Sequence, residues 1–123
     1  MTLSEKANDI IMQPAHTDDD ILELSKIAWQ MWLLYWKSAA IAWEQEANYN
    51  QTRATSYEEH RKDSTQWDAE RKAKLDAEVL YWDFRTLKGK VTQMKSFIER
   101  IDKVCIAYYF KAKAERSASM TTQ

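Results

Sequence analysis

The chain has 123 residues, with 18 Lys and Arg against 19 Asp and Glu, which gives a formal net charge of −1. This length suits one domain with its own hydrophobic core, and the near-neutral charge argues neither for nor against nucleic acid as a partner. The chain has a single Gly and a single Pro, which excludes a sheet fold, because a sheet needs turn residues at short intervals. It also has a single Cys, which excludes an internal disulfide. The composition therefore predicts an all-α protein.

The first predicted element is a short helix over about residues 3–12. Thr2 and Glu5 match a capping box, in which each residue satisfies a backbone N–H of the other. The apolar residues of the segment recur at helical spacing and share one face: Leu3, Ala7, Ile10 and Ile11. Pro14 ends this helix.

The N-terminal segment also bears on localisation. It lacks the basic flank followed by an apolar run that an export signal needs. The apolar run 27–43 contains Gln30, Lys37 and Ser38 and is aromatic at its centre, which is untypical of a membrane span. Together with the lone Cys105, which fits a reducing compartment, these features predict a cytoplasmic protein without a membrane segment.

The most apolar predicted element is a core helix over about residues 18–50, with Thr17 as its N-cap and three aspartates in its first turn. Three adjacent stripes repeat every seven residues: Trp29, Trp36 and Trp43; Ile21, Ala28, Tyr35 and Ala42; Ile27, Leu34 and Ile41. A helix with so wide an apolar face must be enclosed by neighbours from its own chain or from a second copy. We therefore place four tryptophans in the core or in an oligomer interface: Trp29, Trp32, Trp36 and Trp43. Because Trp36 is then a core residue, changing it to Ala is expected to lower the free energy of unfolding by several kcal/mol.

After residue 50 the apolar pattern weakens and the chain is predicted to reverse. Ser56 with Glu59 and Asp63 with Gln66 are two capping candidates. They predict a break near residues 50–54, a short helix over about 57–62 and a new helix start near Ser64. The alternative is one uninterrupted first helix that turns only at residues 63–65.

The last predicted element is a long helix over about residues 65–116. Apolar side chains trace steps of three and four residues along it, from Trp67 to Phe110. Gly89 lies inside this helix at a cost of about 1 kcal/mol relative to Ala, and we expect a kink or a close helix contact there. Residues 117–123 are small and polar, so we expect this tail to fray.

The helix lengths predict an antiparallel hairpin or small bundle that oligomerises. At about 1.5 Å per residue, the predicted helix 65–116 is roughly 75 Å long and the predicted core helix 18–50 is roughly 45 Å long. Antiparallel pairing of these two helices then sets Asp20 beside Lys95 and leaves residues 97–110 beyond the end of the core helix. The overhanging segment carries Ile98, Ile101, Val104 and Tyr108. The N-terminal helix covers part of it, and a second copy is expected to cover the rest, as a homodimer or higher oligomer.

No constellation of residues predicts catalysis, a metal or a cofactor. His60 directly follows two glutamates, so the three side chains fan out around a helix, and His16 stands alone before the aspartates. Cys105 lies between Val104 and Ile106 and is expected to be a buried apolar side chain rather than a nucleophile. A glycine-rich phosphate loop is absent. The sequence therefore predicts a protein that is not an enzyme.

The C-terminal half carries a basic face. Its candidate contact residues for a partner or for nucleic acid are Arg85, Lys88, Lys95, Arg100, Lys103, Lys111 and Lys113. Such a row fits a phosphate backbone, with neighbouring Tyr and Trp side chains stacking on bases, or an acidic partner protein. The row also fits the solvated face of a long helix with cations toward its C-terminus, which is the simpler interpretation.

One stretch of the chain resembles known proteins. The charged segment T-R-A-T-S-Y-E-E-H-R followed by W-D-A-E-R-K-A-K-L-D-A-E-V-L-Y-W-D-F-R-T-L-K-G-K-V-T-Q-M-K-S-F-I-E-R is similar to small helical-hairpin accessory proteins of bacteriophages and prophages. Many of those are encoded in gene clusters for recombination and single-strand DNA handling. The resemblance covers about residues 47–100 and rests on Ala77, Tyr81, Leu87, Lys88, Lys90, Ile98 and Glu99. It implies a phage accessory protein in the host cytoplasm that acts by binding.

These observations favour one function and leave two alternatives open. We expect a non-enzymatic accessory protein that binds a host or phage protein through an aromatic-rich oligomeric surface, in DNA metabolism, recombination or counter-defence, with no cofactor and no small-molecule substrate. The first alternative is single-strand nucleic-acid binding by the basic helix 85–116. The second is a structural or assembly component of a virion.

Overall fold

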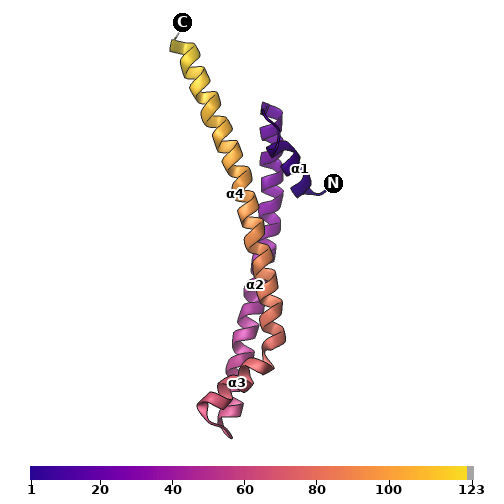
Figure 1. The fold of residues 1–123 in the computed structure, drawn as a ribbon, viewed down its shortest axis with the longest axis vertical. Helices are drawn as coiled ribbons and strands as arrows, with labels where there is room; N and C mark the ends of the chain where they lie inside the picture. Colours follow the sequence, from indigo (N-terminus) through magenta and orange to yellow (C-terminus); the bar gives the residue numbers. More distant parts are fainter. Residues whose placement is uncertain (122–123) are drawn as a thin grey trace. The chain divides into compact units, whose positions relative to one another are not determined.

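The computed structural model describes residues 1–121 and confirms the all-α prediction. Four helices follow one another in the described chain, without a strand: α1, Leu3–Ile11; α2, Asp18–Arg61; α3, Gln66–Asp76; and α4, Glu78–Thr121 (Figure 1). The predicted frayed tail is helical as far as Thr121, and its last two residues lie outside the described part of the chain.

The first two helices begin where their capping residues predict. The backbone N–H of Glu5 donates to Thr2 Oγ1 at 3.2 Å, and the N–H of Thr2 donates to the Glu5 carboxylate at 3.4 Å. Thr17 and Asp20 exchange the same pair of bonds at 3.2 Å and 3.0 Å. Asp20 and Thr17 therefore cap the helix start, and all three aspartates lie in the first turn, where the helix dipole favours negative charge.

The predicted break near residues 50–54 and the separate short helix 57–62 are wrong. The helix α2 runs without interruption for 44 residues, which is the alternative. No Gly or Pro lies between Pro14 and Gly89, and each polar residue of this stretch weakens a helix by well under 1 kcal/mol. Ser56 caps nothing here, because its hydroxyl donates to Asp76 of α3 instead. The chain turns after Arg61, whose guanidinium donates to the carbonyl of Ser64 at 2.9 Å.

The predicted long helix 65–116 is two helices that meet at Ala77. Thr65 caps α3, since its hydroxyl accepts from the N–H of Asp68, and Ala77 departs from helical geometry with φ −99° and ψ 6°. Three alanines spaced by four residues are fully buried, Ala69, Ala73 and Ala77. The close helix contact expected at Gly89 is not found, since nothing lies within 4 Å of a Cβ built there.

The chain divides into two compact units. Unit 1 comprises Met1–Tyr35 and Gln93–Gln123, and unit 2 comprises Trp36–Thr92. One division falls inside α2 and the other inside α4, so no loop separates the two units in the sequence. Each unit has its own cluster of buried side chains, so each is described by itself.

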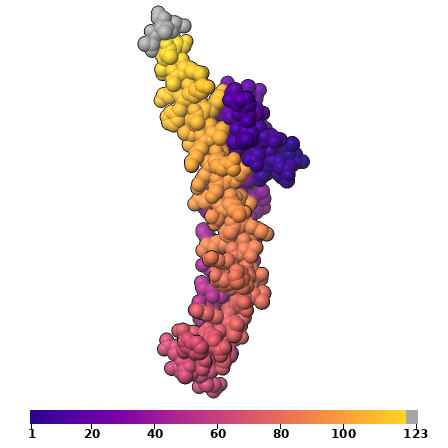
Figure 2. Space-filling view, viewed as in Figure 1, coloured from indigo at the N-terminus to yellow at the C-terminus, as the bar shows by residue number. Residues whose placement is uncertain are grey.

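In unit 1, α1 and the adjoining parts of α2 and α4 share one hydrophobic core. Its buried members are Ala7, Ile21, Leu24, Ile27, Ala28, Met31, Ile98, Ile101 and Cys105. The α2 and α4 segments run antiparallel, since Ser25 lies 3.9 Å from Cys105 and Asp18 accepts a hydrogen bond from Tyr108. Figure 2 shows the indigo N-terminal segment against the orange and yellow part of α4.

This register overturns the predicted overhang of residues 97–110. Asp18 meets Tyr108, whereas the prediction set Asp20 beside Lys95, because α2 is longer than predicted. Ile98 and Ile101 are completely buried by α1 and α2 of the same chain, and Val104 and Tyr108 are half-buried beside them. The overhang is therefore no longer an argument for a second copy.

Three of the four predicted core tryptophans are not in the core of this chain. Trp29, Trp36 and Trp43 are 67%, 57% and 66% exposed, and only Trp32 is half-buried, edge-on to Tyr35 at 5.1 Å. The expected loss of several kcal/mol for Trp36→Ala does not fit this position. The core side of α2 carries smaller aliphatic side chains, so the indoles point away from it.

In unit 2, an aromatic cluster is formed by α2 and the first turns of α4, next to Ala77. Tyr49 and Phe84 are buried with Ala77, and their ring centroids are 5.2 Å apart. Tyr81 packs against both rings, at 5.5 Å from each. The helix break at Ala77 thus lies where a side chain larger than alanine would meet this cluster.

Candidate functional site

The first candidate site is an exposed face of α2 in unit 2, which we call the Trp–Ala seam: Trp36, Ala40, Trp43 and Ala47. All four side chains are exposed, whereas Ala39 and Ala42 of the same helix are 4% and 5% exposed. Steps of four, three and four residues keep the members on one side of a helix, as in a coiled-coil seam. Exposed indoles with such spacing are typical of a contact surface for a protein.

The seam is flanked by one cation and one anion. Lys37 follows Trp36 and Glu44 follows Trp43, so the two charges lie along the same edge of the seam, two helical turns apart. Both side chains are exposed, and neither takes part in an ion pair within the described residues. The seam therefore has an apolar centre and a charge of each sign at one edge.

Unit 1 exposes further apolar side chains. On α2 these are Leu22, Trp29, Leu33 and Leu34, and on α4 they are Ile106, Tyr109 and Phe110. The three α4 residues and Lys113 line an open hollow of about 500 Å³. Unit 1 thus exposes apolar side chains in addition to those buried in its core.

The predicted basic residues are all exposed but are distributed over both units. Arg85 and Lys88 belong to unit 2, and the other five belong to unit 1: Lys95, Arg100, Lys103, Lys111 and Lys113. Arg85 lies 6.0 Å from the ring centroid of Tyr81, and Arg100 lies 5.6 Å from that of Phe97. At these sites the aromatic neighbours face guanidinium groups of their own helix.

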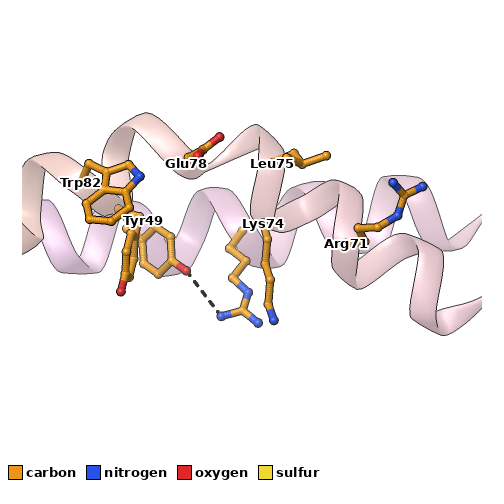
Figure 3. A pocket seen from close by; sticks show the side chains of 8 residues that line it. Tyr49, Arg71, Lys74, Leu75, Glu78 and Trp82 are labelled. Carbon is orange, nitrogen blue, oxygen red and sulfur yellow. Dashed lines mark hydrogen bonds between the residues drawn. The ribbon is translucent and has the colours of Figure 1, made fainter.

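The second candidate site is a cavity in unit 2 where α2, α3 and α4 meet (Figure 3). Its volume is about 530 Å³, within the range of small-molecule sites. It is lined by Tyr49, Arg53, Arg71, Lys74, Leu75, Glu78, Tyr81 and Trp82. Aromatic rings form one part of the lining, and cationic groups outnumber the carboxylate.

The sequence did not indicate this cavity. Its residues come from three helices, and Arg71 and Lys74 approach Tyr81 and Trp82 because the chain bends at Ala77. A cluster of cations and aromatics within residues 71–82 was the one available signal. It could not be interpreted as a site, because an unbroken helix would have spread these side chains around its axis.

Cys105 is buried, as the sequence predicts. Burial raises the pKa of its thiol, while the contact with Ser25 works in the opposite direction. Fewer thiolates are therefore present near neutral pH than for a free cysteine, and a thiolate is the nucleophile in alkylation and disulfide exchange.

We expect Cys105 of the native protein to react with a disulfide reagent at pH 8 at least about tenfold more slowly than in the unfolded chain. The measurement is the rate of thionitrobenzoate release with and without denaturant. Equal rates in the two conditions would contradict burial of the thiol.

The two histidines are bound to nearby groups and do not form a catalytic pair. His16 Nε2 lies 2.7 Å from the carbonyl oxygen of Ile10. His60 Nε2 lies 2.8 Å from Asp76 at the end of α3. The hydrogen bond from Ser56, together with that of His60, lowers the pKa of the Asp76 carboxyl. These contacts lie at helix ends; those of Asp76 are exposed to solvent, and that of His16 is partly buried.

Among the residues that the structure describes, no three His, Cys, Asp or Glu side chains gather in a way that would hold a metal ion. No helix in the described range combines the length and the apolar character needed to cross a bilayer.

Comparison of the chain with protein-family models, with curated proteins and with solved structures finds no match.

Proposed function

We propose that this chain is a non-enzymatic accessory protein of the phage type, an antiparallel helical hairpin that self-associates and binds a protein partner in DNA metabolism, recombination or counter-defence. The observation that carries the proposal is the Trp–Ala seam of unit 2, an exposed row of large and small side chains at coiled-coil spacing. The occupant that fits it best is a second copy of this chain.

The seam is complementary to itself in an antiparallel arrangement. With the midpoint between Ala40 and Trp43 as the centre of symmetry, Trp36 meets Ala47 of the second copy and Trp43 meets Ala40 of the second copy. Each indole then faces a small side chain, which lets the helices approach and buries the ring. A parallel arrangement in register would set tryptophan against tryptophan and alanine against alanine.

The charges of the seam favour the same arrangement. In this register Lys37 lies along the edge opposite Glu44 of the second copy, and the symmetry produces the contact twice. Opposite charges at such an edge direct which orientation forms more than they add affinity. Shape and charge thus select one antiparallel register.

The test is sedimentation velocity of the full chain over a range of concentrations, with charge-reversal variants. We expect wild type to form a dimer, and Lys37→Glu or Glu44→Lys alone to raise the dimer Kd roughly tenfold, because two attractive contacts become repulsive. The double variant, which exchanges the charges, is expected to restore the wild-type Kd. Lys88→Gln, at an exposed cation away from α2, is the control.

A monomer at every concentration would overturn the self-association. A dimer in which the double variant is as weak as the single variants would overturn the antiparallel register. Large stable assemblies without a soluble partner in a pull-down would favour the virion or assembly component instead.

The exposed cations of α4 support a second candidate, single-strand nucleic-acid binding by the helix segment 85–116. Nine Lys and Arg side chains there are exposed: Arg85, Lys88, Lys90, Lys95, Arg100, Lys103, Lys111, Lys113 and Arg116. Binding to an oligothymidine whose log affinity falls linearly with log salt concentration would support it. Absence of retention on a phosphate column at low salt would remove it.

A further inference from the structure

We infer that the cavity of unit 2 binds a nucleoside phosphate, either a free nucleotide or one nucleotide of a single strand. The inference uses other side chains than the Trp–Ala seam and does not depend on self-association. It rests on aromatic rings and cationic side chains that line one hollow where three helices meet (Figure 3).

The aromatic side of the cavity suits a planar base. Trp82 is 57% exposed, and the edge-on contact of Tyr81, with centroids 5.3 Å apart and planes at 76°, supports its indole from one side. Tyr81 is in turn held by the buried ring of Tyr49 at 5.5 Å. An exposed indole on a rigid aromatic base offers a face for stacking, which contributes similarly for every base.

The cationic side suits a phosphate. The guanidinium of Arg53 donates to the hydroxyl of Tyr49 at 3.5 Å, so this group is held beside the cavity rather than free in solvent. Lys74 lines the same side and forms no ion pair within the described chain. Arg71 has a partner, Asp68 of its own helix, at 3.9 Å. Neither Arg53 nor Lys74 forms an ion pair within the described residues, so both groups are available to a phosphate.

The carboxylate of Glu78 orients the ligand. It is the acid among the lining side chains, and Figure 3 shows it between Trp82 and Leu75, away from the end of the Lys74 side chain. A phosphate is repelled from Glu78 and attracted to Arg53 and Lys74, whereas ribose hydroxyls and base amino groups donate to a carboxylate. The phosphate then lies toward α2 and α3, and the base lies on Trp82 of α4.

The test is isothermal titration calorimetry of the full chain with AMP, adenosine and inorganic phosphate. We expect saturable binding of AMP, and binding at least about tenfold weaker for the two fragments, because each makes only half of the contacts. Lys74→Gln and Trp82→Leu are each expected to weaken AMP binding about tenfold or more while the helical circular dichroism is unchanged. Lys62→Gln, at an exposed position of unit 2 outside the cavity, should bind as wild type.

A second ligand distinguishes the two sources of the nucleotide. If an oligothymidine of eight nucleotides binds more tightly than AMP and is weakened by the same two variants, the site serves a single strand; equal affinities indicate a free nucleotide. The inference is overturned if neither ligand binds at millimolar concentration, or if a phosphotyrosine peptide binds and nucleotides do not. An equal loss in Lys62→Gln and Lys74→Gln would also overturn it, because general charge would then explain the binding.

Discussion

Changing Ile101 to Ala is expected to lower the free energy of unfolding by about 2–5 kcal/mol. Ile101 is 0% exposed and lies in the core that α1, α2 and α4 form in unit 1. The shorter side chain removes buried methyl groups and leaves a cavity that the surrounding helices fill only partly. The measurement is urea unfolding followed by circular dichroism, at protein concentrations well below the dimer Kd.

The matched control for this prediction is Trp29→Ala. It removes a larger side chain from the same unit, but one that is 67% exposed, so we expect a change within about 1 kcal/mol in the monomer. If Trp29→Ala destabilised the monomer more than Ile101→Ala, the assignment of the core face of α2 would be wrong.

Changing Ala40 to Glu is expected to raise the dimer Kd at least about a hundredfold. In the proposed antiparallel pairing Ala40 faces Trp43 of the second copy, so the new carboxylate would be buried without a partner, which costs several kcal/mol. The monomer should keep its stability, because Ala40 is exposed and Glu is nearly as good a helix former as Ala. Sedimentation velocity and urea unfolding measure the two effects separately.

Thr86→Glu is the control for this variant, since it adds the same charge to an exposed position of α4 in the same unit, outside the Trp–Ala seam. We expect it to dimerise nearly as wild type does. If Ala40→Glu and Thr86→Glu dimerised equally well, the seam would not be the interface, and the association would have to use another surface.

The sequence was informative wherever local interactions decide the structure. The cap at Thr2 with Glu5 and the cap at Thr17 with Asp20 were both predicted from residue type and spacing, because a side chain that satisfies free N–H groups acts within one helical turn. The scarcity of Gly and Pro likewise predicted an all-α chain and left nothing to interrupt α2.

The sequence did not show which side of a helix faces the core. The apolar stripes of α2 surround the helix, so periodicity did not show that Leu24 and Ile27 face the core and that Trp29 faces solvent. The candidate sites share this limit. The spacing of the Trp–Ala seam was visible in the sequence as a tryptophan repeat, but its exposure was not, and the cavity of unit 2 was not visible at all.

Residue type and spacing alone thus determined that the chain is helical, where α1 and α2 begin, and that Cys105 lies in an apolar part of its helix. Only the tertiary structure decided the bend at Ala77, the pairing of Asp18 with Tyr108 and the face of α2 that is buried. The reason is the range of the interactions: caps and helix propensity act within a few residues, whereas the bend and the register depend on how small and large side chains from distant helices fit together.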